Sequence, residues 1–339
     1  MILMCKDNPV YDIDKNTVIN ESLMPGAMLN KESFGLWVGA RKTVLSNAIA
    51  RRLRFNAFGY SAEEAITKRT HMLSLSDCYW IKHEGEDVRF EQISPYYIEF
   101  WSGLEGAYDE GPIPTLYTNG ARDKYWVDAE RLFKAGCEIE IEAYKLAEIL
   151  EIPCNKIEKH KSGNHNGVIV HNITNENVML ESARCSGVIK DEVFATIDEI
   201  IENFGDDGLT MMSFDAITGN IDRHVENFGY LRDANTGEYL GMAPLYDFDQ
   251  ILKASVMFET DHLLQSIPVN DITENLCRKT IELSEHSTFV KRAMIIMEKH
   301  FNKNPSTKEG YMSKINKAMA DNEKNGKDTP ALRPCSKER

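Results

Sequence analysis

The residues best suited to chemistry lie in a polar loop, FDAITGNIDRHVENFGYL, at residues 214–231. Asp222 and Asn227 are five positions apart in this loop, His224 lies between them, and apolar runs flank the loop on both sides. Carboxylate and amide oxygens suit Mg²⁺, which proteins usually share with phosphate oxygens and water. Asp and Asn also form turns, but their crowding between two apolar runs favours a functional loop.

A second aspartate is predicted to return to this loop through a hairpin. The chain leaves Asn227 along one strand, turns at 235–237 and comes back through EYLGMAPLYDFD, which contains Asp247. In phosphoryl transfer, one Asp accepts or orients the proton of the nucleophile, while an Asn and another Asp hold metal. The spacing of Asp222, Asn227 and Asp247 therefore predicts a phosphotransferase loop.

The same reaction needs a positive group for the nucleotide phosphates and an anion that holds this group. Lys134, in RLFKAG, ends an apolar strand, and the helix that follows offers Glu138, Glu140 and Glu142. Glu140 lies three residues before Ala143, on the face of the helix that is predicted to be buried. We favour Glu140 as the partner of Lys134, although a solvated acidic first turn would also suit the start of a helix.

A polar turn precedes the lysine strand and is a candidate backbone cradle for phosphates. In TNGARDK, Asn119 and Gly120 form a turn signal. The candidate contacts are Asn119, Gly120, Ala121, Arg122 and Lys124. The stretch matches neither GxxxxGK[ST] nor GxGxxG, and by itself it is an ordinary turn. Its position just before Lys134 is what favours a binding role.

With these residues collected, the sequence resembles the HipA-type kinases, which are members of the protein-kinase-like superfamily. The likeness covers residues 115–310 and is strongest in GNIDRHVENFG and APLYDFD. The DRH..N and DF patterns are also similar to phosphoinositide lipid kinases, but this short chain lacks their long scaffold. The first 110 residues do not clearly match the small N-terminal subdomain of the toxin kinases, and the glycine turn lacks their serine-rich form.

The resemblance implies an α+β, two-lobed protein-kinase-like fold with a sheet-rich N-lobe, a helical C-lobe and an extra N-terminal segment. It implies ATP and Mg²⁺ as cofactors, with ATP bound in the cleft between the lobes. The implied roles are catalysis by Asp222, metal binding by Asn227 and Asp247, phosphate binding by Lys134 paired with Glu140, a phosphate loop at Asn119–Lys124, and adenine binding by backbone near His171 and Ile173.

His224 has two interpretations that the sequence leaves open. In the lipid kinases the histidine of this motif is a candidate base or transition-state group, and an imidazole titrates near neutral pH. Alternatively, His224 is a structural residue that packs the loop.

Composition and charge exclude several classes of protein. The 339 residues carry a formal net charge of −14, which argues against a dedicated nucleic-acid binder. No apolar run is long enough to span a membrane, and the N-terminus does not resemble a signal peptide. The seven cysteines are scattered without a CxxC, which predicts reduced thiols, a cytoplasmic location and no zinc site.

The pattern of elements predicts a sheet-rich half followed by a helical half. Strand, turn and strand are expected over 115–136, and further strands over 165–174 and 176–184. Helices are expected over 46–55, 61–69, 138–152, 190–205, 206–218, 280–302 and 306–320. The predicted division is an N-terminal helical segment (1–75), an N-lobe (76–175), a C-lobe (176–320) and a flexible tail (321–339).

Four functions are compatible with these features. The leading one is an ATP- and Mg²⁺-dependent kinase that acts on Ser or Thr of a protein substrate. The second is a kinase for a lipid or small molecule, which the lack of a membrane-binding stretch disfavours. The third is a catalytically silent nucleotide-binding regulator of a toxin–antitoxin or mobile-element system. The fourth is an accessory factor of transcription or excision with an antitoxin-like partner, in which the basic stretch 40–55 would contact DNA or that partner.

Overall fold

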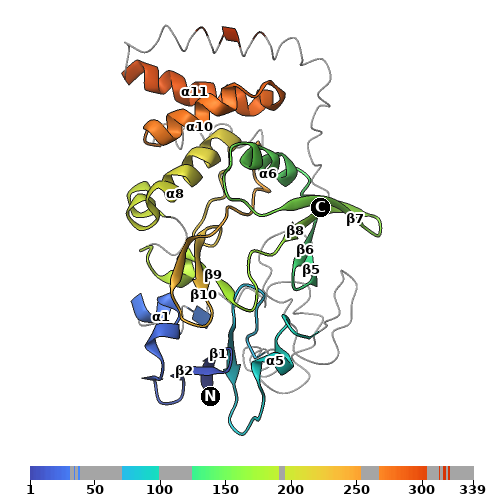
Figure 1. Ribbon diagram of the computed structural model, residues 1–339, viewed down its shortest axis with the longest axis vertical. Coiled ribbons are helices and arrows are strands. Elements are labelled where there is room, and N and C mark those ends of the chain that lie inside the picture. The colour runs from blue at the N-terminus through green and yellow to red at the C-terminus, as the bar shows by residue number, and fades with distance from the viewer. Residues whose placement is uncertain are drawn as a thin grey trace, which may run out of the picture. The chain divides into compact units, whose positions relative to one another are not determined.

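The computed structural model describes residues 1–30, 71–98, 124–190, 195–252 and 267–303, with a few isolated positions beyond them (Figure 1). These residues form both helices and strands, which confirms the predicted α+β class. The helices expected at 46–55 and 61–69, the turn at 119–122, most of the helix expected at 306–320 and the tail lie outside the described residues. Among the described helices, none has the length and apolar character needed to cross a membrane.

The chain forms two compact units. The first comprises Met1–Phe204 with Asp222–Asp249, and the second comprises Gly205–Ile221 with Gln250–Arg339. All strands of the described residues belong to the first unit. This division differs from the boundary expected at 175/176, because the strands after residue 176 join the sheet-rich unit.

Residues 2–18 form strands, although they were expected to belong to a helical segment. The strands pair in the order β3-β2-β1-β4, and all neighbours are antiparallel. Short apolar runs and a two-residue loop at Lys6 and Asp7 suit a hairpin, and Lys6 adopts a positive φ of 51°. The elements here are β1 (Ile2–Cys5), β2 (Asn8–Asp12), β3 (Thr17–Val18), η1 (Glu21–Leu23), α1 (Gly26–Asn30), β4 (Tyr79–Lys82) and α5 (Phe90–Ile93).

A second antiparallel sheet carries Lys134. Its order is β5-β6-β8-β7, with β5 (Lys124–Asp128), β6 (Arg131–Ala135), β7 (Ile157–Ser162) and β8 (His165–His171). The arm after residue 120 was expected to be one strand, but it is itself a hairpin. Asp128 closes the turn, because its carboxylate accepts the backbone N–H of Glu130 at 3.0 Å.

The predicted helix after this hairpin is confirmed as α6 (Glu140–Ile149), which ends before Pro153. Its buried residues are Glu140, Ala143, Leu146 and Ala147. The periodicity therefore identified the correct face of the helix, and a charged residue lies in the middle of that apolar face.

A three-stranded sheet of order β11-β10-β9 follows, and it contains the predicted hairpin. The carboxylate of Asp233 closes the hairpin turn by accepting the backbone N–H groups of Asn235 and Thr236. The elements are β9 (Val178–Ser182), α7 (Ala183–Ser186), β10 (Gly229–Asp233) and β11 (Tyr239–Met242).

The two helices expected over 190–218 follow each other directly as α8 (Ile197–Thr218). They are separated by a kink at Gly205, whose φ of 54° and ψ of −132° are accessible mainly to glycine. Thr196 begins the helix, because its hydroxyl accepts the N–H of Glu199 and its own N–H donates to the Glu199 carboxylate. That cap explains why the helix starts later than the apolar spacing predicted.

The second unit also holds α10 (Asp271–Ile281) and α11 (Ser287–Lys303). One helix was expected over 280–302, but the chain breaks at η6 (Ser284–His286). Asn270 begins α10 by accepting the backbone N–H groups of Ile272 and Thr273.

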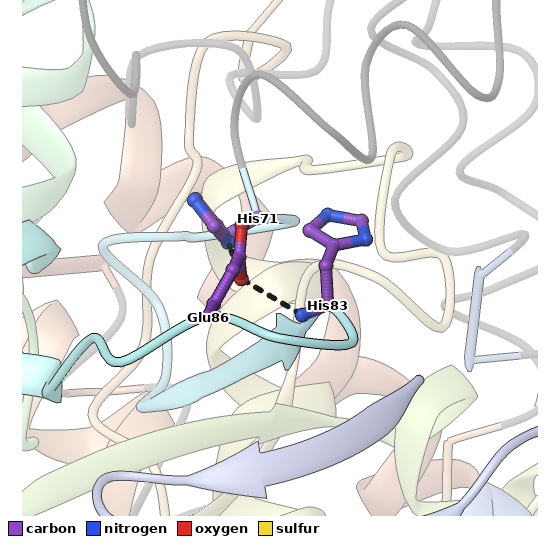
Figure 2. A group of neighbouring side chains, drawn as sticks. All are labelled: His71, His83 and Glu86. Atoms are coloured by element: carbon purple, nitrogen blue, oxygen red, sulfur yellow. Dashed lines mark hydrogen bonds and ion pairs between the residues drawn. The ribbon is translucent and has the colours of Figure 1, made fainter.

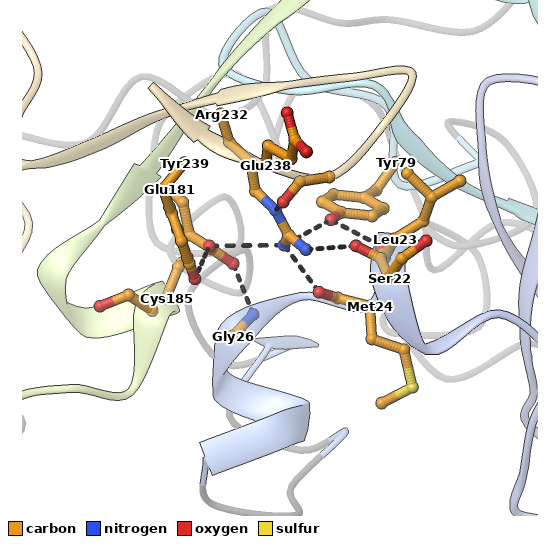
Figure 3. A network of polar contacts seen from close by, with 12 residues as sticks. Ser22, Leu23, Met24, Gly26, Tyr79, Glu181, Cys185, Arg232, Glu238 and Tyr239 are labelled. Carbon is orange, nitrogen blue, oxygen red and sulfur yellow. Dashed lines mark hydrogen bonds and ion pairs between the residues drawn. The ribbon is translucent and has the colours of Figure 1, made fainter. Parts of the chain in front are cut away.

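A buried arginine attaches the N-terminal segment to the β9–β11 sheet (Figure 3). Arg232 on β10 is 3% exposed, and its guanidinium donates to the carbonyl oxygens of Met24 at 2.7 Å, Ser22 at 2.7 Å and Gly237 at 2.6 Å. Its counter-ion is Glu181 on β9, at 3.5 Å. These contacts join segments that are about 200 residues apart in sequence, and the N-terminal residues are therefore part of the same packed unit.

The carboxylate of Glu181 is satisfied by further donors. It accepts the backbone N–H of Gly26 at 2.6 Å and the hydroxyl of Tyr239 at 2.8 Å. Removing Arg232 would leave this buried charge without its counter-ion, which costs more than the loss of a surface pair.

We expect Arg232→Met to lower the free energy of unfolding by roughly 3–5 kcal/mol, because it strands the Glu181 carboxylate and three carbonyl oxygens. Urea unfolding followed by circular dichroism measures the effect. Arg131→Met is the matched control, since Arg131 is about half exposed and forms an ion pair with Asp128 at the surface. Equal stability of the two variants would contradict the structural role of Arg232.

Candidate functional site

A buried lysine lies between two carboxylates in the sheet-rich unit. The Nζ of Lys134 is 3.0 Å from Oε1 of Glu140 and 2.8 Å from Oδ1 of Asp247. Lys134 comes from β6, Glu140 from the first turn of α6, and Asp247 follows β11. The structure thus brings together three residues that the sequence predicted to cooperate, although Asp247 is more than 100 positions away from the other two.

The charges of these groups depend on one another. Burial would lower the pKa of Lys134, but the carboxylates of Glu140 and Asp247 outweigh it and raise that pKa. Burial likewise opposes ionisation of Asp247, and the Lys134 ammonium overcomes it, lowering the pKa of this carboxyl to about 2. For Glu140, burial dominates and raises the pKa of the carboxyl. At neutral pH the ammonium therefore stabilises the ionised Asp247.

Asp247 has an unusual backbone conformation. Its φ of 61° lies in the left-handed region, which residues other than glycine seldom adopt and which is often found at functional sites. The next residue, Phe248, is fully buried, and its backbone N–H points to Oε2 of Glu140 at 3.4 Å. The buried Phe248 therefore fixes the direction in which the Asp247 side chain points.

The loop that contains Asp222 and Asn227 is held by its own hydrogen bonds. The side-chain amide of Asn227 donates to the carbonyl of Asp222 at 2.7 Å, and the backbone N–H of Asn227 donates to the carbonyl of His224 at 2.8 Å. Asn227 is 5% exposed. The amide nitrogen is thus committed to the loop, which leaves Oδ1 as the atom of Asn227 that can meet a ligand.

Arg223 joins this loop to the chain before Asp247, a role that the sequence reasoning missed. Its guanidinium donates to the carbonyl of Asn227 at 2.5 Å and to the carbonyl of Tyr246 at 2.8 Å. In return, the hydroxyl of Tyr246 donates to the carbonyl of Glu226 at 2.9 Å. The guanidinium also lies 5.0 Å from the centre of the Phe248 ring. The predicted return of Asp247 to the loop is therefore achieved through an arginine.

The oxygen atoms of Asn227 and Asp247 fit a hard divalent cation. One oxygen of Asp247 pairs with Lys134, and among the described residues no donor reaches its second oxygen or Oδ1 of Asn227. The Asp247 side chain is 30% exposed, so its carboxylate can be reached. An amide oxygen and a carboxylate oxygen are typical Mg²⁺ ligands, with water and phosphate completing the shell.

Lys124 lies directly opposite Lys134 in the register of β5 and β6. Residues paired in this way share a face of the sheet, and like charges there repel each other. Burial is the main cause that lowers the pKa of Lys124. No carboxylate of the described residues lies within ion-pair distance of its ammonium. The other candidates for the phosphate loop, Asn119, Gly120, Ala121 and Arg122, lie outside the described residues.

The expected adenine segment begins where β8 ends. The backbone of His171 is already bonded, because its N–H donates to Lys156 and its carbonyl accepts the amide of Asn155 at 3.3 Å. Ile173 is different: within the described part of the chain, its N–H and its carbonyl have no hydrogen-bond partner. Of the two residues, Ile173 has the backbone groups that adenine could use.

Glu138 and Glu142 are not placed with Lys134. Glu142 pairs with Lys145 at 3.1 Å on the exposed side of α6, and Glu138 precedes the helix. The helical periodicity was therefore sufficient to choose Glu140 among the three acidic residues.

Comparison with known proteins yields structural likenesses only. No family model matches the chain, and no curated protein does. One solved structure that matches is the Helicobacter pylori proinflammatory kinase CtkA, with 16% identity and a TM-score of 0.38 over 53% of this chain and 94% of that one. Another is HipA of Shewanella oneidensis MR-1, solved with HipB and operator DNA of a toxin–antitoxin system; it shows 12% identity and a TM-score of 0.48 over 94% of this chain and 95% of that one.

A HipA structure is thus among those to which this chain is similar, as the sequence motifs predicted. The identities and TM-scores are low, and these likenesses carry no information about activity. The roles proposed below depend on the contacts of this chain's own side chains.

The ion pair between Lys134 and Asp247 should make stability depend on acid pH. Because the folded-state pKa of Asp247 is about 2, below its ordinary value, its contribution to stability is complete above pH about 4 and declines as pH falls toward 2. We expect wild type to exceed Asp247→Asn by on the order of 2 kcal/mol in free energy of unfolding at pH 6, and by much less at pH 2. Urea unfolding across this range measures the difference. A difference that does not change with pH would contradict the ion pair.

Proposed function

We propose that the protein is an ATP- and Mg²⁺-dependent kinase whose acceptor is a Ser or Thr hydroxyl of a protein. The observation that carries this proposal is the contact of Lys134 with both Glu140 and Asp247. A lysine held by a helix carboxylate beside a metal-binding aspartate is the arrangement that protein kinases use to position nucleotide phosphates. Asp222 and Asn227, joined to the Asp247 segment by Arg223, complete the set.

In this proposal each side chain has a separate task. Lys134 binds the α- and β-phosphates of ATP, and Lys124 adds a second positive charge on the same face of the sheet. Asp222 orients the acceptor hydroxyl and takes its proton as the oxygen forms a bond to the γ-phosphorus. The bond from that phosphorus to the β-phosphate oxygen breaks, and ADP leaves. Asn227 and Asp247 would hold Mg²⁺, which would supply positive charge to neutralise the phosphates.

His224 fits a positioning role better than the role of a base. Its Nδ1 accepts the backbone N–H of Glu226 at 3.2 Å, so in the neutral ring the proton is on Nε2. The lone pair that a base would need is therefore already engaged. Nε2–H remains a donor that could face the transferred group.

Other acceptors would fit the same site. A lipid or small-molecule acceptor would use the same residues, and so would a regulator that binds ATP without turnover. An antitoxin-like partner is a further proposal. Incubation with labelled ATP and separate protein, lipid and small-molecule acceptors distinguishes a protein kinase, a lipid or small-molecule kinase and a regulator without turnover.

We expect Asp222→Asn and Asp247→Asn each to reduce transfer of the γ-phosphate by at least about a thousandfold, because one removes the proton acceptor and the other a metal ligand. Transfer of label from ATP to protein, with mapping of the modified residues by mass spectrometry, measures this. Asp233→Asn is the control, since Asp233 closes a hairpin turn and its replacement keeps an acceptor oxygen. Full transfer by both Asp222→Asn and Asp247→Asn would sink the assignment.

Three substitutions separate the tasks of His224. His224→Asn keeps an acceptor near the position of Nδ1, His224→Gln places a donor near the position of Nε2, and His224→Ala keeps neither. If His224 only holds the Glu226 N–H, the Asn variant should retain most of the kcat and the other two should lose about tenfold or more. Rescue by Gln but not by Asn would show instead that the Nε2–H group acts on the reacting phosphate.

A further inference from the structure

Three metal-capable side chains meet at the end of β4, and none of them has a part in the proposed phosphotransfer. His71, His83 and Glu86 each offer a ligand atom, and these atoms lie within 4.8 Å of one another (Figure 2). His83 and Glu86 belong to the turn that follows β4, and His71 lies on the segment that leads toward it. The cluster is therefore assembled from two parts of the chain.

Backbone contacts orient His71. Its Nδ1 lies 3.0 Å from the carbonyl oxygen of Ile81, and because a carbonyl can only accept, Nδ1 carries the proton. Nδ1 is also the ring nitrogen that lies near the carboxylate of Glu86, 3.7 Å from Oε2. In the neutral ring the lone pair is on Nε2, so the His71 ring has to turn for Nε2 to face the other two ligands. The backbone strengthens this attachment, since the N–H of Ile81 donates to the carbonyl of His71 at 2.7 Å. Metal-binding histidines commonly donate their other ring nitrogen to a backbone carbonyl in this way.

The carboxylate of Glu86 is held by the turn itself. Its Oε2 accepts the backbone N–H of His83 at 2.8 Å, and the backbone N–H of Glu86 donates to the carbonyl of His83 at 3.3 Å. In Figure 2 the carboxylate lies between His71 and the backbone of His83. Within the described part of the chain, no donor is bonded to its second oxygen. One carboxylate oxygen thus supports the turn, and the other can bind a cation.

The packing of the cluster suits a small ion. The side chains of His71 and Glu86 are only 12% and 29% exposed. The centres of the imidazole rings of His71 and His83 are 5.4 Å apart. Tetrahedral Zn²⁺ places its ligands about 3.4 Å from one another, given metal–ligand bonds of about 2.1 Å. Closing the remaining gap requires rotation of the side chains, including a turn of the His71 ring.

We propose that His71, His83 and Glu86 form a Zn²⁺ site that ties the segment at residue 71 to the turn after β4. Two imidazoles and one carboxylate are a known three-ligand set for Zn²⁺, with a further position for water. Imidazole nitrogen favours Zn²⁺ over Mg²⁺, so this site and the phosphotransfer site would select different ions. The sequence argued against zinc only because the cysteines lack a pattern, and this cluster contains no cysteine.

The test uses the full-length, metal-free protein in excess Mg²⁺, so that Mg²⁺ occupies the carboxylates of the phosphotransfer site. We expect titration calorimetry and native mass spectrometry to show one Zn²⁺ per chain, and Zn²⁺ to raise Tm. His83→Ala and Glu86→Gln should each weaken binding at least about tenfold. Glu86→Gln keeps an acceptor for the His83 N–H, so its fold is expected to survive.

The controls locate the ion. His165→Ala removes an exposed imidazole on the β7–β8 hairpin and should bind Zn²⁺ as wild type does. Asp247→Asn should also bind normally, which separates this proposal from the kinase proposal. Co²⁺ in place of Zn²⁺ should give a spectrum without a thiolate charge-transfer band. Unchanged affinity in both cluster variants, a thiolate band, or a folded wild type that binds no Zn²⁺ would overturn the site.

Discussion

The buried ammonium of Lys134 is the interaction on which the rest of the candidate site depends. A lysine in such surroundings is unfavourable unless carboxylates compensate its charge, and two do so from different parts of the chain. Glu140 fixes how α6 lies on the second sheet, and Asp247 fixes where the chain emerges from the β10–β11 hairpin. One charge thus determines the relative positions of a strand, a helix and a hairpin.

Much of this arrangement could be predicted from the sequence, because its signals are local. The spacing of apolar residues placed Glu140 on the buried face of α6, and the turn residues at 235–237 gave the hairpin that returns Asp247. Both predictions used periods fixed by backbone geometry. Asp222, Asn227 and Asp247 were found in a different way, because a phosphotransfer reaction requires particular residue types at particular spacings.

Other features could not be predicted, because they depend on contacts between distant segments. The N-terminal strands are short, and the pairing of β1 with β4 joins segments that are more than 70 residues apart in sequence. In the sequence, Arg223 is one residue of the DRH..N motif with no assigned role. Its role follows from its hydrogen bond to the carbonyl of Tyr246, which is distant in sequence. The cluster of His71, His83 and Glu86 has no recognisable spacing, since the hydrogen bonds between His71 and Ile81 bring one member to the other two.

The opposed lysines of β5 and β6 have a consequence for how the protein responds to its surroundings. Lys124 and Lys134 repel each other on one face of the sheet, and the carboxylates of Glu140 and Asp247 form ion pairs with Lys134, whereas burial still lowers the pKa of Lys124. A bound polyanion would remove this repulsion, so the second sheet would be more stable with its ligand than without it. By mass action, its resistance to local unfolding and proteolysis would then rise with the logarithm of the nucleotide concentration. Under the function proposed above this ligand is ATP, and the lifetime of the protein in a cell would then be coupled to the supply of ATP.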